Sequence, residues 1–225
     1  MKQFLEWLAS KNNFSLLFFF LSMGLVVPPM VEQTALHSPA FQLCFSLAIL
    51  SGVVAMRKEG EFINFGLTVS VVCLSLVWLD YMIGGAVLKI ISLGLYIVYF
   101  CILFYKTTHL ILSKDQISNQ LLIAGIAGYM LLGYISAFAL MLVQISYPQS
   151  FGISDDKFLQ DLIYFAFVTL STVGYGDITP ETSVAKSVSV LIGVAGQMYL
   201  TLLVALLVGK YLQNPTLPSS DEKSD

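Results

Sequence analysis

The chain has 225 residues, of which 57% are hydrophobic and only 11% are charged, and its mean hydropathy is +0.82. A soluble domain of this length does not carry so many apolar residues, so the composition predicts a membrane protein. The formal net charge is -3 with a single arginine, Arg57, and this excludes nucleic-acid binding because no basic face exists to meet phosphate.

Apolar stretches of membrane-spanning or nearly spanning length recur along the chain and predict an all-α fold with six transmembrane helices. The first stops at the pair Pro28 and Pro29. The predicted helices cover residues 14–27, 40–56, 63–78, 86–105, 117–145 and 182–212. A shorter apolar segment, residues 157–170, is too short to cross a membrane and is predicted to be a re-entrant helix.

Basic residues predict the orientation, because lysine and arginine in short loops stay on the cytoplasmic side. They lie before the first helix, between the second and third, and between the fourth and fifth, at Lys2, Lys11, Arg57, Lys58, Lys106 and Lys114. We therefore expect a multi-pass protein of the cell membrane with both termini in the cytoplasm. A cleaved signal peptide is the competing interpretation of the N-terminus, but residues 16–27 are not followed by a small-residue cleavage pattern.

The segment from Thr169 to Pro180 reads T-L-S-T-V-G-Y-G-D-I-T-P and directly follows the re-entrant segment. Gly174 and Gly176 lack a Cβ and can adopt the positive φ angles that point successive carbonyls in one direction. The Thr172 hydroxyl can add a further oxygen. A glycine-rich extracellular turn would explain the glycines, but it would explain neither the preceding helix nor the long apolar segment that follows.

The run Thr172, Val173, Gly174, Tyr175 and Gly176 resembles the selectivity filter of potassium channels. In such a filter, four copies of the loop surround one axis and their oxygens replace the water shell of the ion. The resemblance implies that K⁺ binds at Thr172, Val173, Gly174 and Tyr175.

Residues next to this run extend the resemblance. Tyr164 and Phe165 stand where similar channels carry a pair of aromatic residues that supports the filter. We predict that Tyr164 donates a hydrogen bond to Asp177, just outside the filter. Val168 stands where some bacterial channels carry a glutamate that partners this aspartate, so here one polar partner of Asp177 is missing.

The last helix also resembles the inner helix of bacterial potassium channels, from Val194 to Gly209. The resemblance places Gly196 at the gating hinge of those channels. Gly196 and Gly193 could equally form a small-residue face for close helix packing.

The fourth predicted helix departs from voltage-gated relatives, whose fourth helix carries a basic residue at every third position. Residues 86–105 contain only Lys89, and residues 40–56 contain no acid to pair with such charges. Lys89 could instead pair with Asp80 or extend to the membrane interface. The sequence therefore predicts weak or absent voltage dependence.

Taken together, the chain resembles a bacterial six-transmembrane potassium channel of the tetrameric voltage-gated-like cation channel superfamily. The resemblance implies three parts: a four-helix, voltage-sensor-like domain without gating charges (1–112), a pore domain (113–212) and a disordered cytoplasmic tail (213–225), with no cytoplasmic regulatory domain. Its expected partners are three further copies in a homotetramer, membrane lipids and K⁺ as the permeant ion, with no cofactor and no soluble substrate.

Other functions fit the sequence less well. A poorly selective cation channel is the alternative in the same class. A secondary transporter should show two matching broken helices, but only one re-entrant segment is predicted. An enzyme would need converging titratable groups, whereas His37 and His109 lie in predicted loops on opposite sides, so we expect no enzymatic activity. A non-conducting accessory subunit is the last alternative.

Overall fold

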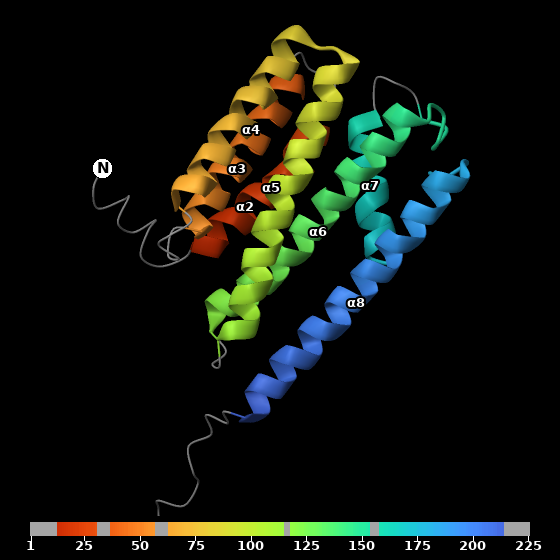
Figure 1. Cartoon of the computed structure of the whole chain (residues 1–225). Helices are drawn as coiled ribbons and strands as arrows, with labels where there is room; N and C mark the ends of the chain where they lie inside the picture. The colour runs from red at the N-terminus through yellow and green to blue at the C-terminus, as the bar shows by residue number, and fades with distance from the viewer. Residues whose placement is uncertain (1–12, 31–36, 57–62, 115–117, 154–157, 214–225) are drawn as a thin grey trace, which may run out of the picture.

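The computed structural model describes residues 13–30, 37–56, 63–114, 118–153 and 158–213. All regular structure in these residues is helical, which confirms the predicted all-α class for this part of the chain. Figure 1 shows the helices in order: α2 (Asn13–Met30), α3 (His37–Met56), α4 (Ile63–Ile83), α5 (Ala86–Ser113), α6 (Asn119–Ser146), α7 (Phe158–Leu170) and α8 (Ser183–Gln213).

Helix α6 joins the two parts of the molecule, because it packs against α2 and α5 on one side and against α7 and α8 on the other. The core at this junction is rich in aromatic residues. The Phe45 ring of α3 stacks on Phe100 of α5 with ring centroids 5.5 Å apart, and it meets Phe138 of α6 edge-on at 5.3 Å. One hydrophobic core therefore runs through both predicted domains.

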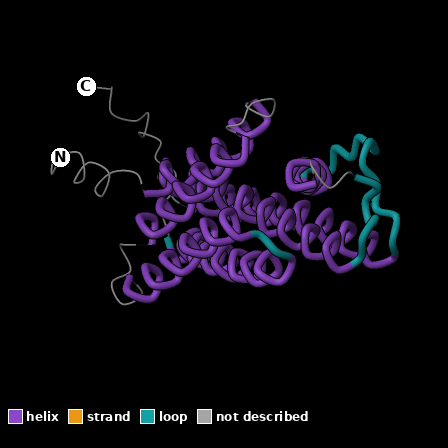
Figure 2. The backbone as a smooth tube through the Cα atoms, turned by 90° about the horizontal axis from the view of Figure 1, so that it is seen from above, coloured by secondary structure: helices purple, strands orange, loops and turns teal. Residues whose placement is uncertain are grey.

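Of the three helices that are long enough to span a membrane, α8 is the least buried. It contacts α6 and α7 along one side (Figure 1). Near its C-terminal end, the Lys210 side chain donates hydrogen bonds to the carbonyls of Ile111, Leu112 and Lys114 at the end of α5. Viewed from above in Figure 2, the two loops that flank α7, residues 147–153 and 171–182, lie together on one side of the molecule.

The predicted end of the first helix at residue 27 is wrong, because α2 continues through Pro28 and Pro29 to Met30. The fixed φ of proline is close to the helical value, so two prolines fit the last turn. They supply no N–H, and the carbonyls of Gly24 and Leu25 lose the donors that residues four positions later normally provide.

Three other predicted boundaries also shift. Helix α3 begins at His37, three residues early, because Pro39 falls in the first turn, where its missing N–H breaks no hydrogen bond. Helices α4 and α5 run on to Ile83 and Ser113. Lys106, placed in a loop by the sequence analysis, thus lies inside α5, because no proline or glycine ends the helix before it.

Three helices of the described part are long and apolar enough to cross a membrane: Val87–Ser113, Asn119–Ser146 and Ser183–Leu212. Shorter apolar helical stretches are Phe14–Met30, Gln42–Ala55, Leu67–Ile83 and Leu159–Leu170. The chain therefore has the helices of a multi-pass membrane protein, and six spans remain a prediction.

Tyrosine hydroxyl groups connect neighbouring helices at three places, and the geometry is the same at each. Each donates a hydrogen bond to a backbone carbonyl that lies three residues before a glycine, and a Cβ on that glycine would come within 3.0 Å of the hydroxyl oxygen. The three sets of tyrosine, acceptor and glycine are Tyr99, Ile49 and Gly52; Tyr134, Leu21 and Gly24; and Tyr199, Gly125 and Gly128. The glycine thus opens the space through which the hydroxyl reaches the carbonyl.

The Tyr134 contact can be tested by a double-mutant cycle. Gly24→Ala should destabilise the protein by about 1–3 kcal/mol through overpacking. Tyr134→Phe should lower the stability of the protein by about 0.6–2 kcal/mol, because it removes one hydrogen bond within the membrane. The double variant should lose less stability than the two single variants lose together, because phenylalanine lacks the oxygen with which the new methyl group would clash.

The measurement is thermal unfolding in detergent, with Gly94→Ala as the control because a Cβ at Gly94 meets nothing within 4 Å. Additive effects of the two changes would contradict the contact.

Candidate functional site

The backbone of the Thr172–Gly176 segment alternates in the sign of φ. Thr172, Gly174 and Gly176 have φ of 61°, 55° and 80°, whereas Val173 and Tyr175 between them do not have positive values. Both glycines thus adopt the conformation predicted from the sequence. Alternation of this kind turns successive carbonyls toward the same side of the chain.

The carbonyl of Val168, in the last turn of α7, holds this segment against the helix. It accepts hydrogen bonds from the amides of Val173 at 3.1 Å and Gly174 at 3.3 Å, and from the Ser171 hydroxyl at 3.2 Å. The amide of Thr172 donates a hydrogen bond to the backbone carbonyl of Thr169 at 3.0 Å. Because these amides face α7, the carbonyls of the segment are free to face away from it.

Thr172 is the residue of this segment whose conformation the sequence does not predict. A β-branched residue rarely adopts a positive φ, and such a conformation costs on the order of 1–3 kcal/mol. Strain of this size persists only where the surroundings impose it, and it concentrates at functional sites. The hydrogen bonds to α7 on either side of Thr172 impose it here.

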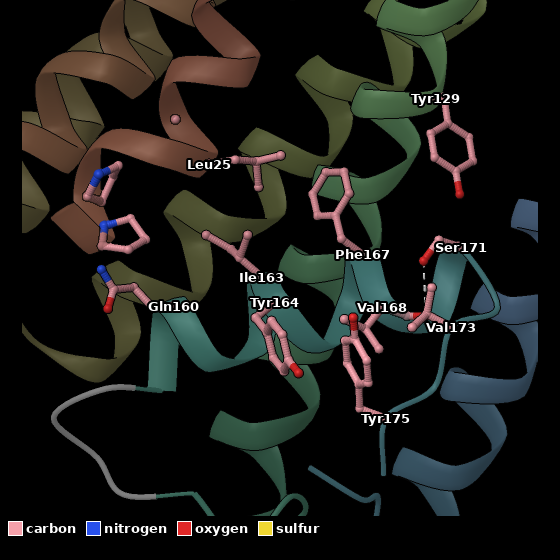
Figure 3. A pocket seen from close by; sticks show the side chains of 13 residues that line it. Leu25, Tyr129, Gln160, Ile163, Tyr164, Phe167, Val168, Ser171, Val173 and Tyr175 are labelled. Carbon is pink, nitrogen blue, oxygen red and sulfur yellow. Dashed lines mark hydrogen bonds between the residues drawn. The ribbon is translucent and has the colours of Figure 1, made fainter. Parts of the chain in front are cut away.

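Tyr164 supports the outer end of the segment. Its hydroxyl donates a hydrogen bond to the Asp177 carboxylate at 2.6 Å, as predicted, and its ring stacks on Tyr175 with centroids 6.5 Å apart and planes 4° from parallel (Figure 3). This hydrogen bond holds the pKa of Asp177 below its ordinary value of 3.8, helped by the amides of Asp177 and Ile178. Asp177 is therefore a carboxylate at neutral pH.

The other predicted site residues are placed differently. Phe165 is buried and its ring contacts Phe151, with centroids 5.3 Å apart, so it packs under the loop after α6 and away from the Tyr164–Tyr175 pair. Gly196 lies against the end of α7, where a Cβ would come within 3.0 Å of the Leu170 carbonyl oxygen. The close-packing interpretation of Gly196 thus has a direct structural basis, and its role as a hinge stays a prediction.

A second set of contacts, which the sequence analysis missed, ties the two loops flanking α7 together. The Ser150 hydroxyl lies 3.0 Å from that of Thr182, and the Ser150 carbonyl accepts from the Glu181 amide at 2.8 Å. Thr182 also caps α8 by accepting from the Ala185 amide at 3.3 Å. Ser150 lies in a predicted loop and Thr182 at the predicted start of the last helix, and neither position gives a signal of this pairing.

A cavity of about 410 Å³ lies on the α2 side of the segment (Figure 3). It is bounded by the proline-containing end of α2, by Tyr129 of α6, by one face of α7 and by the side chains of Val173 and Tyr175. The lining is predominantly apolar. The Tyr129 hydroxyl is buried and has no hydrogen-bond partner within the described residues.

The part of the chain that holds this site is similar to known proteins. Residues 121–213, which contain α6 except its first two residues, α7, the Thr172–Gly176 segment and α8, match the family model for ion channels. Together with the apolar helices, this match supports a multi-pass membrane protein.

The curated relatives are potassium channels by name. The chain is 37% identical over 68 residues to a voltage-gated potassium channel from Aeropyrum pernix, which is 30% of this chain and 22% of the relative. It is 35% identical over 66 residues to two-pore potassium channel 4 from Arabidopsis thaliana (29% and 23%) and 31% identical over 96 residues to two-pore potassium channel 2 (43% and 21%). The matches thus span less than a quarter of each relative. No solved structure matches the chain significantly.

The contact between Tyr164 and Asp177 predicts a measurable pH effect. Because the pKa of Asp177 is depressed in the folded protein, the contribution of its carboxylate to stability is present above pH 3.8 and is lost as the pH falls through the folded-state pKa. In Tyr164→Phe, the pKa of Asp177 should rise toward 3.8, since the largest cause of the depression is removed. Carbon-13 NMR titration of the carboxylate would measure it, and an unchanged pKa would contradict the assignment.

Proposed function

We propose that this chain is one subunit of a potassium-selective channel that conducts K⁺ passively through four copies of the Thr172–Gly176 segment around one axis. The observation that carries the proposal is the alternation of φ, together with amides that are held by Val168. Carbonyls on one side of such a segment can replace the water shell of a cation without any charged side chain. In this proposal K⁺ binds at Thr172, Val173, Gly174 and Tyr175.

Exposure of the segment supports the assembly into four copies. Within a single chain, Val173 is 53% and Tyr175 72% exposed, although both are large apolar side chains next to a cavity. Helix α8 also exposes apolar side chains along much of its length. A ring of four chains would cover both surfaces, and a closed homotetramer is the simplest such ring.

The lengths of the helices support six membrane spans. At 1.5 Å per residue, α2, α3 and α4 with 18, 20 and 21 residues are about 27–32 Å long, which matches the hydrocarbon thickness of about 30 Å. Helix α7 has 13 residues and is about 20 Å long, so it fits a re-entrant pore helix. Its C-terminal end, which carries the negative end of the helix dipole, lies beside Thr172.

Weak or absent voltage dependence belongs to the same proposal. Voltage-dependent opening needs several charges that move through the membrane field. Within α5, Lys89 and Lys106 are the lysines, and they are more than four helical turns apart. Lys89 lies close enough to Asp80 for their charges to interact, which supports a local pairing at this end of the helix.

Potassium efflux from proteoliposomes tests the proposed function. Gly174 has a φ of 55°, which alanine adopts only with strain, so Gly174→Ala should change the direction of a carbonyl in the segment. A Cβ at this position meets no atom within 4 Å, so the substitution does not disturb the packing. Efflux should fall on the order of tenfold or more, the factor that about 1.4 kcal/mol adds to a barrier. Gly94→Ala, also free of contacts, should conduct like the parent. Equal efflux from Gly174→Ala and the parent would contradict the proposed filter.

A further inference from the structure

The cavity on the α2 side of the candidate filter is not part of the proposed conduction path. Its volume of about 410 Å³ falls within the range of small-molecule sites, about 300–1,000 Å³. In Figure 3, Leu25 of α2 points toward Ile163 and Phe167 of α7. The side chains of Val173 and Tyr175 bound the same cavity on the filter side. An occupant would therefore contact both α2 and the candidate filter.

The lining decides which kind of molecule the cavity can hold. None of the described residues that line it carries a charged side chain. Two of its hydroxyl groups already donate hydrogen bonds, that of Tyr164 to Asp177 and that of Ser171 to the Val168 carbonyl. A buried water needs about two to four polar partners, and apolar cavities stay dry and bind apolar molecules. The chemistry of the lining thus fits an uncharged hydrocarbon group.

The end of α2 leaves this space open. Pro28 and Pro29 line the cavity with compact rings that cannot extend across it. Pro29 is exposed, and Tyr164 on the opposite wall is 38% exposed, so the cavity reaches the surface between α2 and α7. A molecule can enter there without unfolding either helix.

The bilayer is the source of apolar groups at this place. Helices α2, α6 and α7, which supply most of the lining, all contain apolar stretches and belong to one chain. In the proposed ring, a neighbouring chain covers the exposed side of the filter segment, while the walls formed by these helices stay in place. Acyl chains fill the hydrocarbon core around membrane helices, about 30 Å thick, so they are the apolar groups most available to the opening.

We propose that the cavity binds an uncharged hydrocarbon group from the bilayer, which packs against Val173 and Tyr175 and restrains the candidate filter from behind. The acyl chain of a lipid and a separate apolar molecule present the same chemistry to the lining. A filled cavity opposes movement of the two side chains into it, so occupancy favours the conformation that the segment adopts here. The binding does not depend on the proposed function, whereas the effect on conduction rests on it.

Photolabelling tests the binding and distinguishes the two sources. Proteoliposomes contain either a phosphatidylcholine with a diazirine near the end of one acyl chain, or adamantane diazirine as a separate apolar molecule. After irradiation, mass spectrometry should find adducts on Ile163, which is only 6% exposed and lines the cavity. Adducts from the lipid probe identify an acyl chain as the occupant, and adducts from adamantane diazirine alone identify a separate molecule. Excess unlabelled adamantane should compete with the adamantane probe.

Two variants of neighbouring residues in α2 provide a matched comparison. Leu25→Trp places a larger side chain in the cavity and should lower the adducts on Ile163 at least about tenfold, which corresponds to about 1.4 kcal/mol of lost affinity. Val26→Trp adds the same side chain at a residue that is 57% exposed and does not line the cavity, so the adducts should not change. Absence of adducts on Ile163 with both probes would overturn the site and indicate that a neighbouring copy fills it. Equal labelling of the two variants would also overturn it.

Potassium efflux from the same vesicles tests the effect on the segment. Leu25→Trp should conduct like the parent, because its own side chain takes the place of the hydrocarbon group. Leu25→Asn, whose polar side chain disfavours hydrocarbon without filling the space, should lose both the adducts and at least about threefold in efflux. Equal efflux from Leu25→Asn and Leu25→Trp would overturn the restraint on the segment. Specific adducts in a parent protein that passes no potassium would overturn the proposed function and leave the binding site standing.

Discussion

The hydrogen bonds that the Val168 carbonyl accepts from Val173 and Gly174 decide how the Thr172–Gly176 segment lies. Backbone amides need an acceptor, and once α7 provides it on one side, the carbonyls of the segment must find partners on the other. Thr172 is held in a strained conformation as a result. Among the described residues, no backbone amide donates to the carbonyls of this segment. A dehydrated cation would supply these partners, so the strain at Thr172 and the orientation of the carbonyls have a common explanation in the proposed channel.

The rest of the fold keeps α7 and its carbonyl in place. Gly133 of α6 and Gly196 of α8 allow Phe167 and the Leu170 carbonyl to approach their backbones closely, so α7 is wedged between two long helices. Helix α6 is in turn bound to α2 by the Tyr134 hydroxyl, and α8 to α6 by that of Tyr199. Because hydrophobic attraction between helices is weak in lipid, such close packing at glycine and interhelical hydrogen bonds are the interactions available to hold the bundle together.

Sequence reasoning reached the parts of the site that depend on side-chain identity. Gly174 and Gly176 are recognisable because no other residue adopts positive φ without cost. The Tyr164–Asp177 contact was predicted because Tyr164 stands where similar channels carry an aromatic residue that supports the filter. Sequence reasoning could not predict the role of the Val168 carbonyl, since any residue carries the same group. The sequence also could not predict the three hydrogen bonds from tyrosine hydroxyls to carbonyls of neighbouring helices, because they depend on which helices face each other. The end of α2 was predicted wrongly, because prolines usually mark the end of a helix, whereas Pro28 and Pro29 fit the last turn of this one.

The central claim is that the carbonyls of this segment select potassium, and the most direct test is the reversal potential of the purified protein in a planar bilayer with potassium on one side and sodium on the other. The account predicts reversal near the potassium equilibrium potential, because oxygens held at fixed spacing replace the water shell of one cation better than that of another. A large current that reverses near zero would contradict it.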